Sequence, residues 1–216
     1  MPSTQDHAAL PAPEKLKTIS KAISVLDTIL SPEWQFRYYS YSSKWGDGEE
    51  CLQMRNGQGD EMHILFTATG CAINGFAHEY PQPDKEKVTK GLPAQFDEFI
   101  FGEPVNSIGT TFCLWNEGTS WKTGNIENFD DNSEEMLAIF DGDPQSYINY
   151  ASDYFETELP LPTVASIYSG ETLTKEMVLS IVEDLADWDD LKKDLIEIDY
   201  PFDLPDNPKK SKWKLW

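Results

Sequence analysis

Hydrophobic side chains recur with helical spacing toward both ends of the chain. From Pro13 to Leu30 they fall on one stripe, with lysines toward the opposite face, which predicts an amphipathic helix. Asp143-Pro144 has the cap and first-turn proline of a helix that we expect to end near Phe155. The same spacing predicts helices that begin at Thr174 and at Trp188.

The central part of the chain has the shorter period of β-strands. Its apolar, aromatic and β-branched runs are separated by glycine-containing turns. The expected strands are Gln35–Ser43, Cys51–Arg55, Glu61–Thr67, Cys71–His78, Thr110–Trp115 and Trp121–Ile126. Strands mostly in residues 35–126, with helices before and after, predict an α+β fold. We expect an antiparallel β-sheet packed against the N-terminal and C-terminal helices.

This order of elements predicts one α+β domain over residues 13–200. Residues 1–12 are expected to be a flexible N-terminus, and residues 201–216 a proline-rich and then basic-aromatic tail. The tail ends NPKKSKWKLW, and three interpretations are open: it docks on the acidic body through Trp213, Leu215 and Trp216, it is free, or it is a weak anchor to a membrane surface. Deleting residues 207–216 separates them, because only docking requires a lower melting temperature.

The net charge narrows the kinds of partner. The chain has 17 basic and 38 acidic residues, for a net charge of −21, and residues 126–206 contain only three lysines. Such a balance repels nucleic acid and anionic membranes and favours a basic protein partner, although acidity can also serve solubility alone. The binding residues that we expect are acids near the last helix: Asp184, Asp187, Asp189, Asp190 and Asp194.

Several functional classes lack their signals in the sequence. No apolar run approaches the length of a membrane span, the N-terminus lacks a signal-peptide pattern, and Cys51, Cys71 and Cys113 share no CxxC spacing. These features predict a cytoplasmic protein with buried thiols. GxSxG, HExxH, GxxxxGK and GxGxxG are absent, and we expect no cofactor and no metal.

One cluster of ionisable residues is nevertheless a candidate catalytic or metal-binding site. A tight turn at Asn56–Gly59 predicts that Met54 faces Glu61 and that Leu52 faces His63. A turn at Thr69-Gly70 predicts that Glu61 faces His78. Glu61, His63 and His78 would then share one face of the sheet and could bind a metal or transfer protons. The alternative is a cross-strand Glu–His pair on a solvated face.

Short motifs suggest two resemblances. MRNGxGDE (Met54–Glu61), GFxHE (Gly75–Glu79) and TFCxW (Thr111–Trp115) resemble a family of uncharacterised bacterial proteins over roughly residues 34 to 182. That family has no assigned activity, so the resemblance implies no catalytic residue. LPAQFDEFIF (Leu92–Phe101) is similar to the LPxxFxxFL helix of Smi1/Knr4-type immunity proteins, although their following Asn-Gly is missing and this helix comes after the strands that should follow it.

Two functions follow as expectations. The favoured one is a non-enzymatic acidic protein that caps a basic protein partner, as an immunity-type or regulatory protein would. It predicts a contiguous acidic surface with exposed aromatic side chains and no deep pocket. The alternative is a small hydrolase or metal-dependent enzyme that uses Glu61, His63 and His78, which predicts a cleft where these side chains converge.

Overall fold

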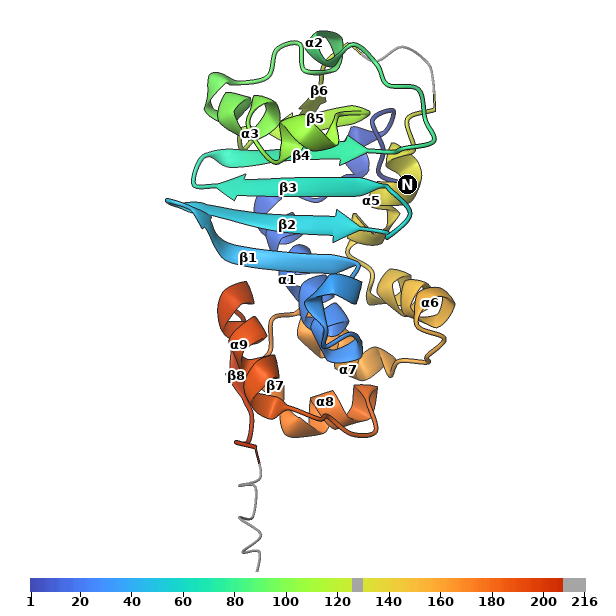
Figure 1. Cartoon of the computed structure of the whole chain (residues 1–216), viewed down its shortest axis with the longest axis vertical. Coiled ribbons are helices and arrows are strands. Elements are labelled where there is room, and N and C mark those ends of the chain that lie inside the picture. The colour runs from blue at the N-terminus through green and yellow to red at the C-terminus, as the bar shows by residue number, and fades with distance from the viewer. Residues whose placement is uncertain (126–129, 208–216) are drawn as a thin grey trace, which may run out of the picture.

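The computed structural model describes residues 1–125 and 130–207, and an antiparallel sheet lies at its centre (Figure 1). Six strands in these ranges pair in the order β1-β2-β3-β4-β5-β6, so each strand lies beside its neighbour in the sequence. The α+β class predicted from the hydrophobic pattern is therefore confirmed. The strands are β1 (Tyr39–Gly46), β2 (Glu49–Arg55), β3 (Glu61–Thr67), β4 (Gly70–Phe76), β5 (Phe112–Asn116) and β6 (Trp121–Thr123).

Helices flank the sheet, and the longest, α1 (Pro13–Leu30), has the predicted bounds. Short helices follow β4 and β6, and the C-terminal helices form a separate layer below β1 in Figure 1. In the described ranges no helix is long and apolar enough to cross a membrane. The other helices are α2 (Lys85–Val88), α3 (Asp97–Phe101), α4 (Val105–Ile108), α5 (Ser133–Leu137), α6 (Pro144–Tyr154), α7 (Leu161–Tyr168), α8 (Lys175–Ile181) and α9 (Trp188–Ile198).

Local sequence explains where three of these helices begin. The side chain of Asp143 accepts a hydrogen bond from the backbone of Gln145 and caps α6, whose first residue is Pro144. Thr174 caps α8, and Asp187 caps α9, in the same way. Helix α7 and a two-strand parallel pair, β7 (Leu173–Thr174) with β8 (Phe202–Asp203), were not predicted.

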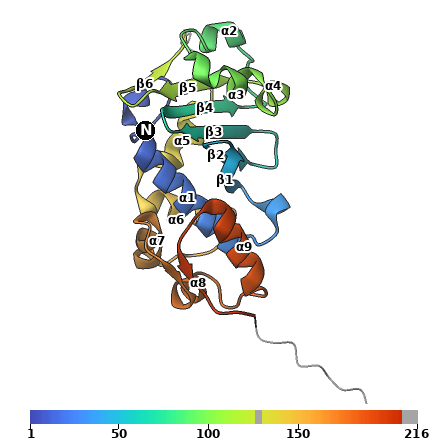
Figure 2. The same ribbon diagram turned by 90° about the vertical axis from the view of Figure 1, so that its left-hand side faces the viewer.

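The two faces of the sheet are covered differently, as Figure 2 shows. The face toward α1 holds the main core, which includes Leu52, Ile64 and Ile73. The opposite face packs a smaller cluster, with Leu65 and Trp115, against α3 and α4. Helix α9 lies beside β1, below the part of the sheet that α3 and α4 cover.

The predicted strand register is wrong at both hairpins. Glu61 lies opposite Arg55 and Phe76, not opposite Met54 and His78. The first turn is one residue longer than expected, because the backbone of Asn56 pairs with Asp60 and the Asn56 side chain accepts hydrogen bonds from Gln58 and Asp60.

The second turn is placed differently. Thr67 pairs with Gly70, so Gly70 begins β4 and does not form the turn. The pairing of β3 with β4 is thus shifted by two residues, which keeps side chains on the same face. The one-residue shift of the first hairpin sends the side chains of β2 to the other face. Leu52 and Met54 therefore point into the main core, whereas Glu61 and His63 lie on the opposite face.

The chain before α1, which we expected to be flexible, packs against the body. The backbone of Thr4 donates to the Ser133 hydroxyl at 3.0 Å, and the Thr4 hydroxyl donates to Asp131 at 2.6 Å. Leu10 belongs to the main core. At the other end, the prediction that Trp213, Leu215 and Trp216 dock concerns residues outside the described ranges.

Candidate functional site

His63 is held deep in the sheet. Its side chain is 2% exposed, and its Nε2 lies 3.1 Å from the side-chain nitrogen of Gln53 on β2. Burial, with a smaller contribution from Arg55, lowers the pKa of His63 to about 4, so the ring is neutral at physiological pH. A neutral ring that is shielded from solvent is poorly placed to exchange a proton with a substrate.

His78 and Glu61 lie in other surroundings. His78 is on the loop after β4, and its Nδ1 lies 2.8 Å from Asp60, which also accepts the His78 backbone N–H. The side chain of Glu61 makes no hydrogen bond or ion pair with another residue of the described ranges. No hydrogen bond or ion pair joins Glu61, His63 and His78, and the described residues include no group of three or more His, Cys, Asp or Glu that could hold a metal ion.

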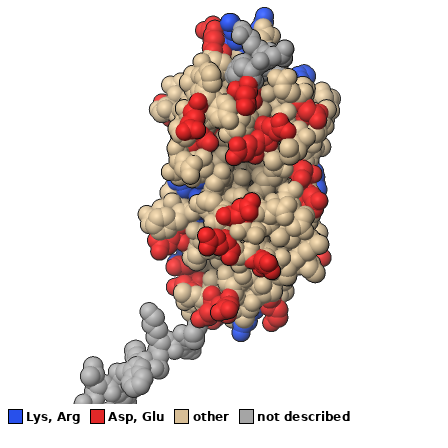
Figure 3. All heavy atoms as spheres, turned by 90° about the vertical axis from the view of Figure 1, so that its right-hand side faces the viewer, with Lys and Arg blue, Asp and Glu red and all other residues tan. Residues whose placement is uncertain are grey.

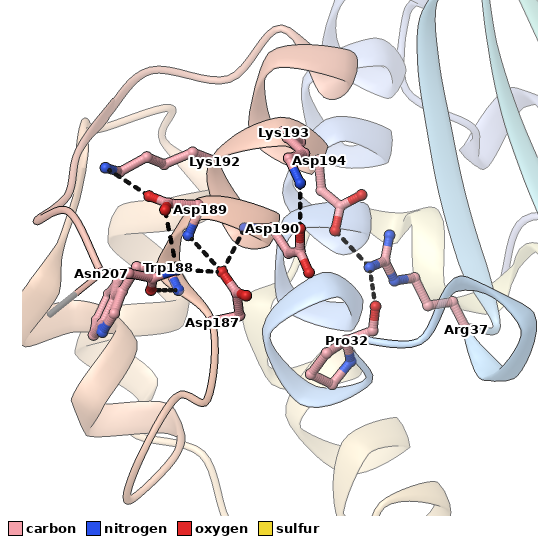
Figure 4. Close-up of polar contacts among 10 residues, drawn as sticks. All are labelled: Pro32, Arg37, Asp187, Trp188, Asp189, Asp190, Lys192, Lys193, Asp194 and Asn207. Atoms are coloured by element: carbon pink, nitrogen blue, oxygen red, sulfur yellow. Dashed lines mark hydrogen bonds and ion pairs between the residues drawn. The ribbon is translucent and has the colours of Figure 1, made fainter. Parts of the chain in front are cut away.

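The acids near α9 mostly contact other parts of the same chain, as Figure 4 shows. Asp194 accepts a hydrogen bond from Arg37 at 2.6 Å, and the Arg37 guanidinium also donates to the carbonyls of Ser31 and Pro32. Only 5% of the Arg37 side chain is exposed. This arginine therefore fastens α9 to the segment between α1 and β1.

The other four acids have local partners. Asp187 accepts the backbone N–H groups of Asp189 and Asp190 and a hydrogen bond from Asn207, which holds its pKa below the usual range. Asp189 pairs with Lys192 at 3.5 Å, and Asp190 with Lys193 at 2.5 Å. Asp184 accepts the backbone N–H of Leu185. Much of the charge that predicted a binding surface is thus used to cap and fasten α9.

Asp27 is a buried acid with a shifted pKa that the sequence pattern did not identify as a candidate site residue. It lies inside the main core and accepts hydrogen bonds from the backbones of Tyr38 and Tyr39 and from the Tyr147 hydroxyl. Burial raises its pKa to about 7, against the effect of these donors. Because it is fully buried, Asp27 joins α1, β1 and α6 rather than contacting a ligand.

Three hollows share lining residues in pairs, and we call them together the groove. The turn-end hollow, of about 400 Å³, lies beside the β2–β3 turn. The central hollow, of about 390 Å³, lies between α9 and strands β1 and β2. The hairpin-end hollow, of about 450 Å³, lies between the β1–β2 hairpin and α3. Arg37 lines the first two hollows and Trp45 lines the last two, so each hollow shares one residue with the next.

The hairpin-end hollow is strongly acidic. Asp47 and Glu49 approach it from the β1–β2 hairpin, and Glu98 and Glu103 approach it from α3 and the loop after it. No lysine or arginine in the described ranges forms an ion pair with any of the four, although Glu103 accepts the backbone N–H of Ser107. Four carboxylates in one hollow without a basic side chain create a local negative potential that attracts cations.

The central hollow is lined by aromatic side chains, and Glu197, which also lines it, forms no ion pair in the described ranges. Trp34 and Trp45 line it, and the charges of Arg37 and Asp194 on its wall are paired with each other. Trp34 is 53% exposed, and the Arg55 guanidinium lies 3.9 Å from the centre of its ring. This cation–π contact holds the indole in place without covering all of it.

Acidic side chains also lie on another face, around α6 (Figure 3), where basic side chains are few. A separate hollow there is lined by Tyr80 with Asp130, Glu134 and Glu135. Asp130 is the main cause of a raised pKa at Tyr80, which reports the negative potential at this place. This hollow shares no lining residue with the groove.

No protein-family model, no curated protein and no solved structure matches the chain. The resemblances to bacterial and Smi1/Knr4-type families therefore stay predictions. The groove itself was missed because its residues come from four separate segments. The exposed, aromatic Trp34-Gln35-Phe36 turn was the one local signal in the sequence.

Proposed function

We propose that this protein binds a basic protein partner without catalysing a reaction, and that the groove is its binding surface. The single observation behind the proposal is the hairpin-end hollow, in which Asp47, Glu49, Glu98 and Glu103 form no ion pair with a lysine or arginine of the described ranges. Free carboxylates keep their charge for an incoming lysine or arginine, whereas those near α9 are already engaged.

The aromatic side chains along the groove support the same function. Trp34 is 53% exposed and Phe36 is 62% exposed, and Tyr154 lies at the turn end. Tryptophan and tyrosine contribute disproportionately to protein–protein affinity, because they bury a large area at a small cost in side-chain entropy. An acidic hollow together with such exposed aromatic side chains favours a macromolecular partner.

The proposal includes the cellular role expected from the sequence. An immunity-type or regulatory protein caps a basic partner and blocks its surface, which requires charge complementarity and no catalytic group. We place this activity in the cytoplasm, since Cys51, Cys71 and Cys113 are all free and buried, as thiols are in a reducing compartment.

The proposal is tested with a defined basic probe. Dye-labelled decalysine is titrated with the full chain at 50 mM and 300 mM salt, and fluorescence anisotropy reports binding. We expect binding that weakens with salt, because exposed charges are screened within about 8 Å at physiological ionic strength. A labelled decaglutamate peptide is the matched control and should not bind.

Two results would contradict the proposal. One is the absence of decalysine binding at low salt. The other is binding that the variant Glu98→Gln leaves unchanged but that Glu134→Gln, in the separate hollow beside Tyr80, abolishes. The second result would move the binding surface to the α6 side of the molecule.

A further inference from the structure

We infer that the turn-end hollow binds a free α-amino acid with an aromatic or other apolar side chain. Arg55 and Arg37 hold the carboxylate of the ligand, and Glu61 holds its ammonium group. Phe36 and Tyr154 contact its side chain, and all five residues line the hollow. The inference goes beyond the proposed function and does not rest on it, because the hairpin-end hollow shares no lining residue with this one.

Two opposite charges at this hollow lie close together without neutralising each other. Arg55 on β2 is directly opposite Glu61 on β3. Residues in such positions have Cβ atoms about 4.5–5.5 Å apart, and opposite charges there stabilise a sheet by pairing. Here the Arg55 guanidinium instead lies 3.9 Å from the centre of the Trp34 ring, and no hydrogen bond or ion pair joins it to Glu61. Both charges are therefore available to one ligand.

Arg37 has a donor without an acceptor at the same hollow. Its side chain is 5% exposed, and its Nε and Nη2 donate to Ser31, Pro32 and Asp194 (Figure 4). Its Nη1 makes no hydrogen bond within the described ranges and is not fully buried, so an incoming group can reach it. The planar guanidinium presents N–H groups in a fork that suits a carboxylate. This second arginine therefore favours a ligand with a carboxylate.

A ligand with a charge of only one sign meets repulsion in this hollow. An anion near Arg55 is also near the unpaired carboxylate of Glu61, and a cation near Glu61 is also near the guanidinium of Arg55. Asp60, the other acid of the hollow, is already engaged by the Asn56 amide and by His78. An α-amino acid carries its two charges on one carbon atom, so it can satisfy both neighbours at once.

The size and the aromatic walls of the hollow favour an apolar side chain on the ligand. Its volume of about 400 Å³ falls within the range of about 300–1,000 Å³ that is usual for ligand sites. Phe36 is 62% exposed and Tyr154 is 46% exposed, so a ligand can cover both. The Tyr154 ring packs on Tyr38 and Tyr150, with ring centres 5.2 and 5.6 Å apart. This wall is thus in place before binding, which reduces the ordering that binding requires.

Four small probes test the inference with the full chain in ligand-observed NMR titrations. L-phenylalanine carries all three groups, N-acetyl-L-phenylalanine lacks the ammonium group, L-phenylalaninamide lacks the carboxylate, and glycine lacks the side chain. The titrations are done at about pH 6, where a free α-amino group is charged. We expect L-phenylalanine to bind about tenfold more tightly than each of the other three, because each of these loses one contact.

Two protein variants assign the charged contacts. Glu61→Gln should weaken L-phenylalanine about tenfold and leave N-acetyl-L-phenylalanine no weaker, because that probe has no ammonium group. Arg55→Gln should weaken L-phenylalanine and leave L-phenylalaninamide no weaker. Glu49→Gln is the matched control, since Glu49 lies at the other end of β2 from Arg55 and lines only the hairpin-end hollow. Urea unfolding of each variant checks that the fold is retained.

Three results would overturn the inference. The first is no binding of L-phenylalanine at millimolar concentration. The second is an equal loss of L-phenylalanine affinity in Glu49→Gln and Glu61→Gln. The third is binding of N-acetyl-L-phenylalaninamide, which has neither charge, as tight as that of L-phenylalanine, because the hollow would then accept a residue within a peptide. Decalysine tests the proposed function separately, so either proposal can fail while the other stands.

Discussion

The acids near α9 and the acids of the hairpin-end hollow differ in what they contact. Asp187, Asp189, Asp190 and Asp194 lie in the most acidic part of the sequence, yet each has a partner within the chain. The four hairpin-end acids come from residues 1–125, which contain ten basic and 16 acidic residues, and they form no ion pair with a lysine or arginine of the described ranges. A high local charge in the sequence therefore does not by itself mark a binding surface.

This comparison predicts two kinds of effect. Carboxylates used inside the fold should determine stability and its pH dependence. Carboxylates without partners should affect binding and leave stability nearly unchanged.

Asp27 is the most deeply engaged acid, and its replacement should change how stability depends on pH. Its pKa is about 7 in the folded protein and 3.8 as the ordinary value, so between these pH values the folded state retains a proton that the unfolded state has lost. The free energy of unfolding therefore falls as the pH rises from about 4 to 7, by about 4 kcal/mol from this group. Asp27→Asn removes that contribution.

Urea unfolding of the wild type and Asp27→Asn at several pH values measures this effect. The stability of the variant relative to the wild type should rise with pH across the range from 4 to 7. The asparagine can keep the same neighbours, because its amide can donate to the Tyr147 hydroxyl while its oxygen accepts from Tyr38 and Tyr39. A difference that does not change with pH would show that Asp27 is not protonated in the folded protein.

His63 should have the opposite effect over nearly the same range. Its pKa falls from 6.5 to about 4 on folding, so the unfolded state binds the additional proton between these values. The free energy of unfolding should rise with pH from about 4 to 6.5, by about 3 kcal/mol from this group. His63→Gln should lose that rise in urea unfolding at the same pH values. An unaltered pH profile would contradict the neutral, buried state of His63.

Arg37 tests whether the ion pairs of α9 stabilise the fold. Arg37→Ala leaves Asp194 and two backbone carbonyls without their donor, and we expect a loss of about 2–3 kcal/mol. The matched control is Lys193→Ala, because the Lys193–Asp190 pair is exposed and should contribute much less to stability. Equal losses by urea unfolding would mean that burial does not distinguish these pairs.

Glu98→Gln should have the smallest effect on stability. The side chain of Glu98 is exposed and has no partner in the described ranges, so the free energy of unfolding should change by less than about 0.5 kcal/mol. Asp97→Asn, on the same helix but outside the hollow, is the matched control. A large loss on Glu98→Gln would place this residue among the structurally engaged acids.

Local signals in the sequence predicted the elements well. The apolar stripe and Pro13 gave the bounds of α1, the cap and proline at Asp143-Pro144 gave the start of α6, and apolar spacing gave α8 and α9. These signals are read within a few residues, which is why they survive in the folded chain. The order of strands before helices was enough to predict the α+β class.

The candidate site was less predictable because it depends on distances along the chain that local patterns do not contain. One additional residue in the Asn56–Asp60 turn changed the partners of Glu61 and the face of Leu52. Arg37 engages Asp194 across 157 positions in the sequence, which no spacing rule anticipates. The free acids could be identified only after these pairings were known.

The central claim is that the hairpin-end acids, and not those near α9, bind a basic partner. The most direct test compares decalysine affinity for two variants with the same change in net charge. One carries Asp47→Asn, Glu49→Gln, Glu98→Gln and Glu103→Gln. The other carries Glu183→Gln and Asp184→Asn, between α8 and α9, with Asp189→Asn and Asp190→Asn, in the first turn of α9. We expect the first to bind about tenfold more weakly than the wild type and the second to stay within about twofold. Equal losses in the two variants, or a larger loss in the second, would contradict the claim.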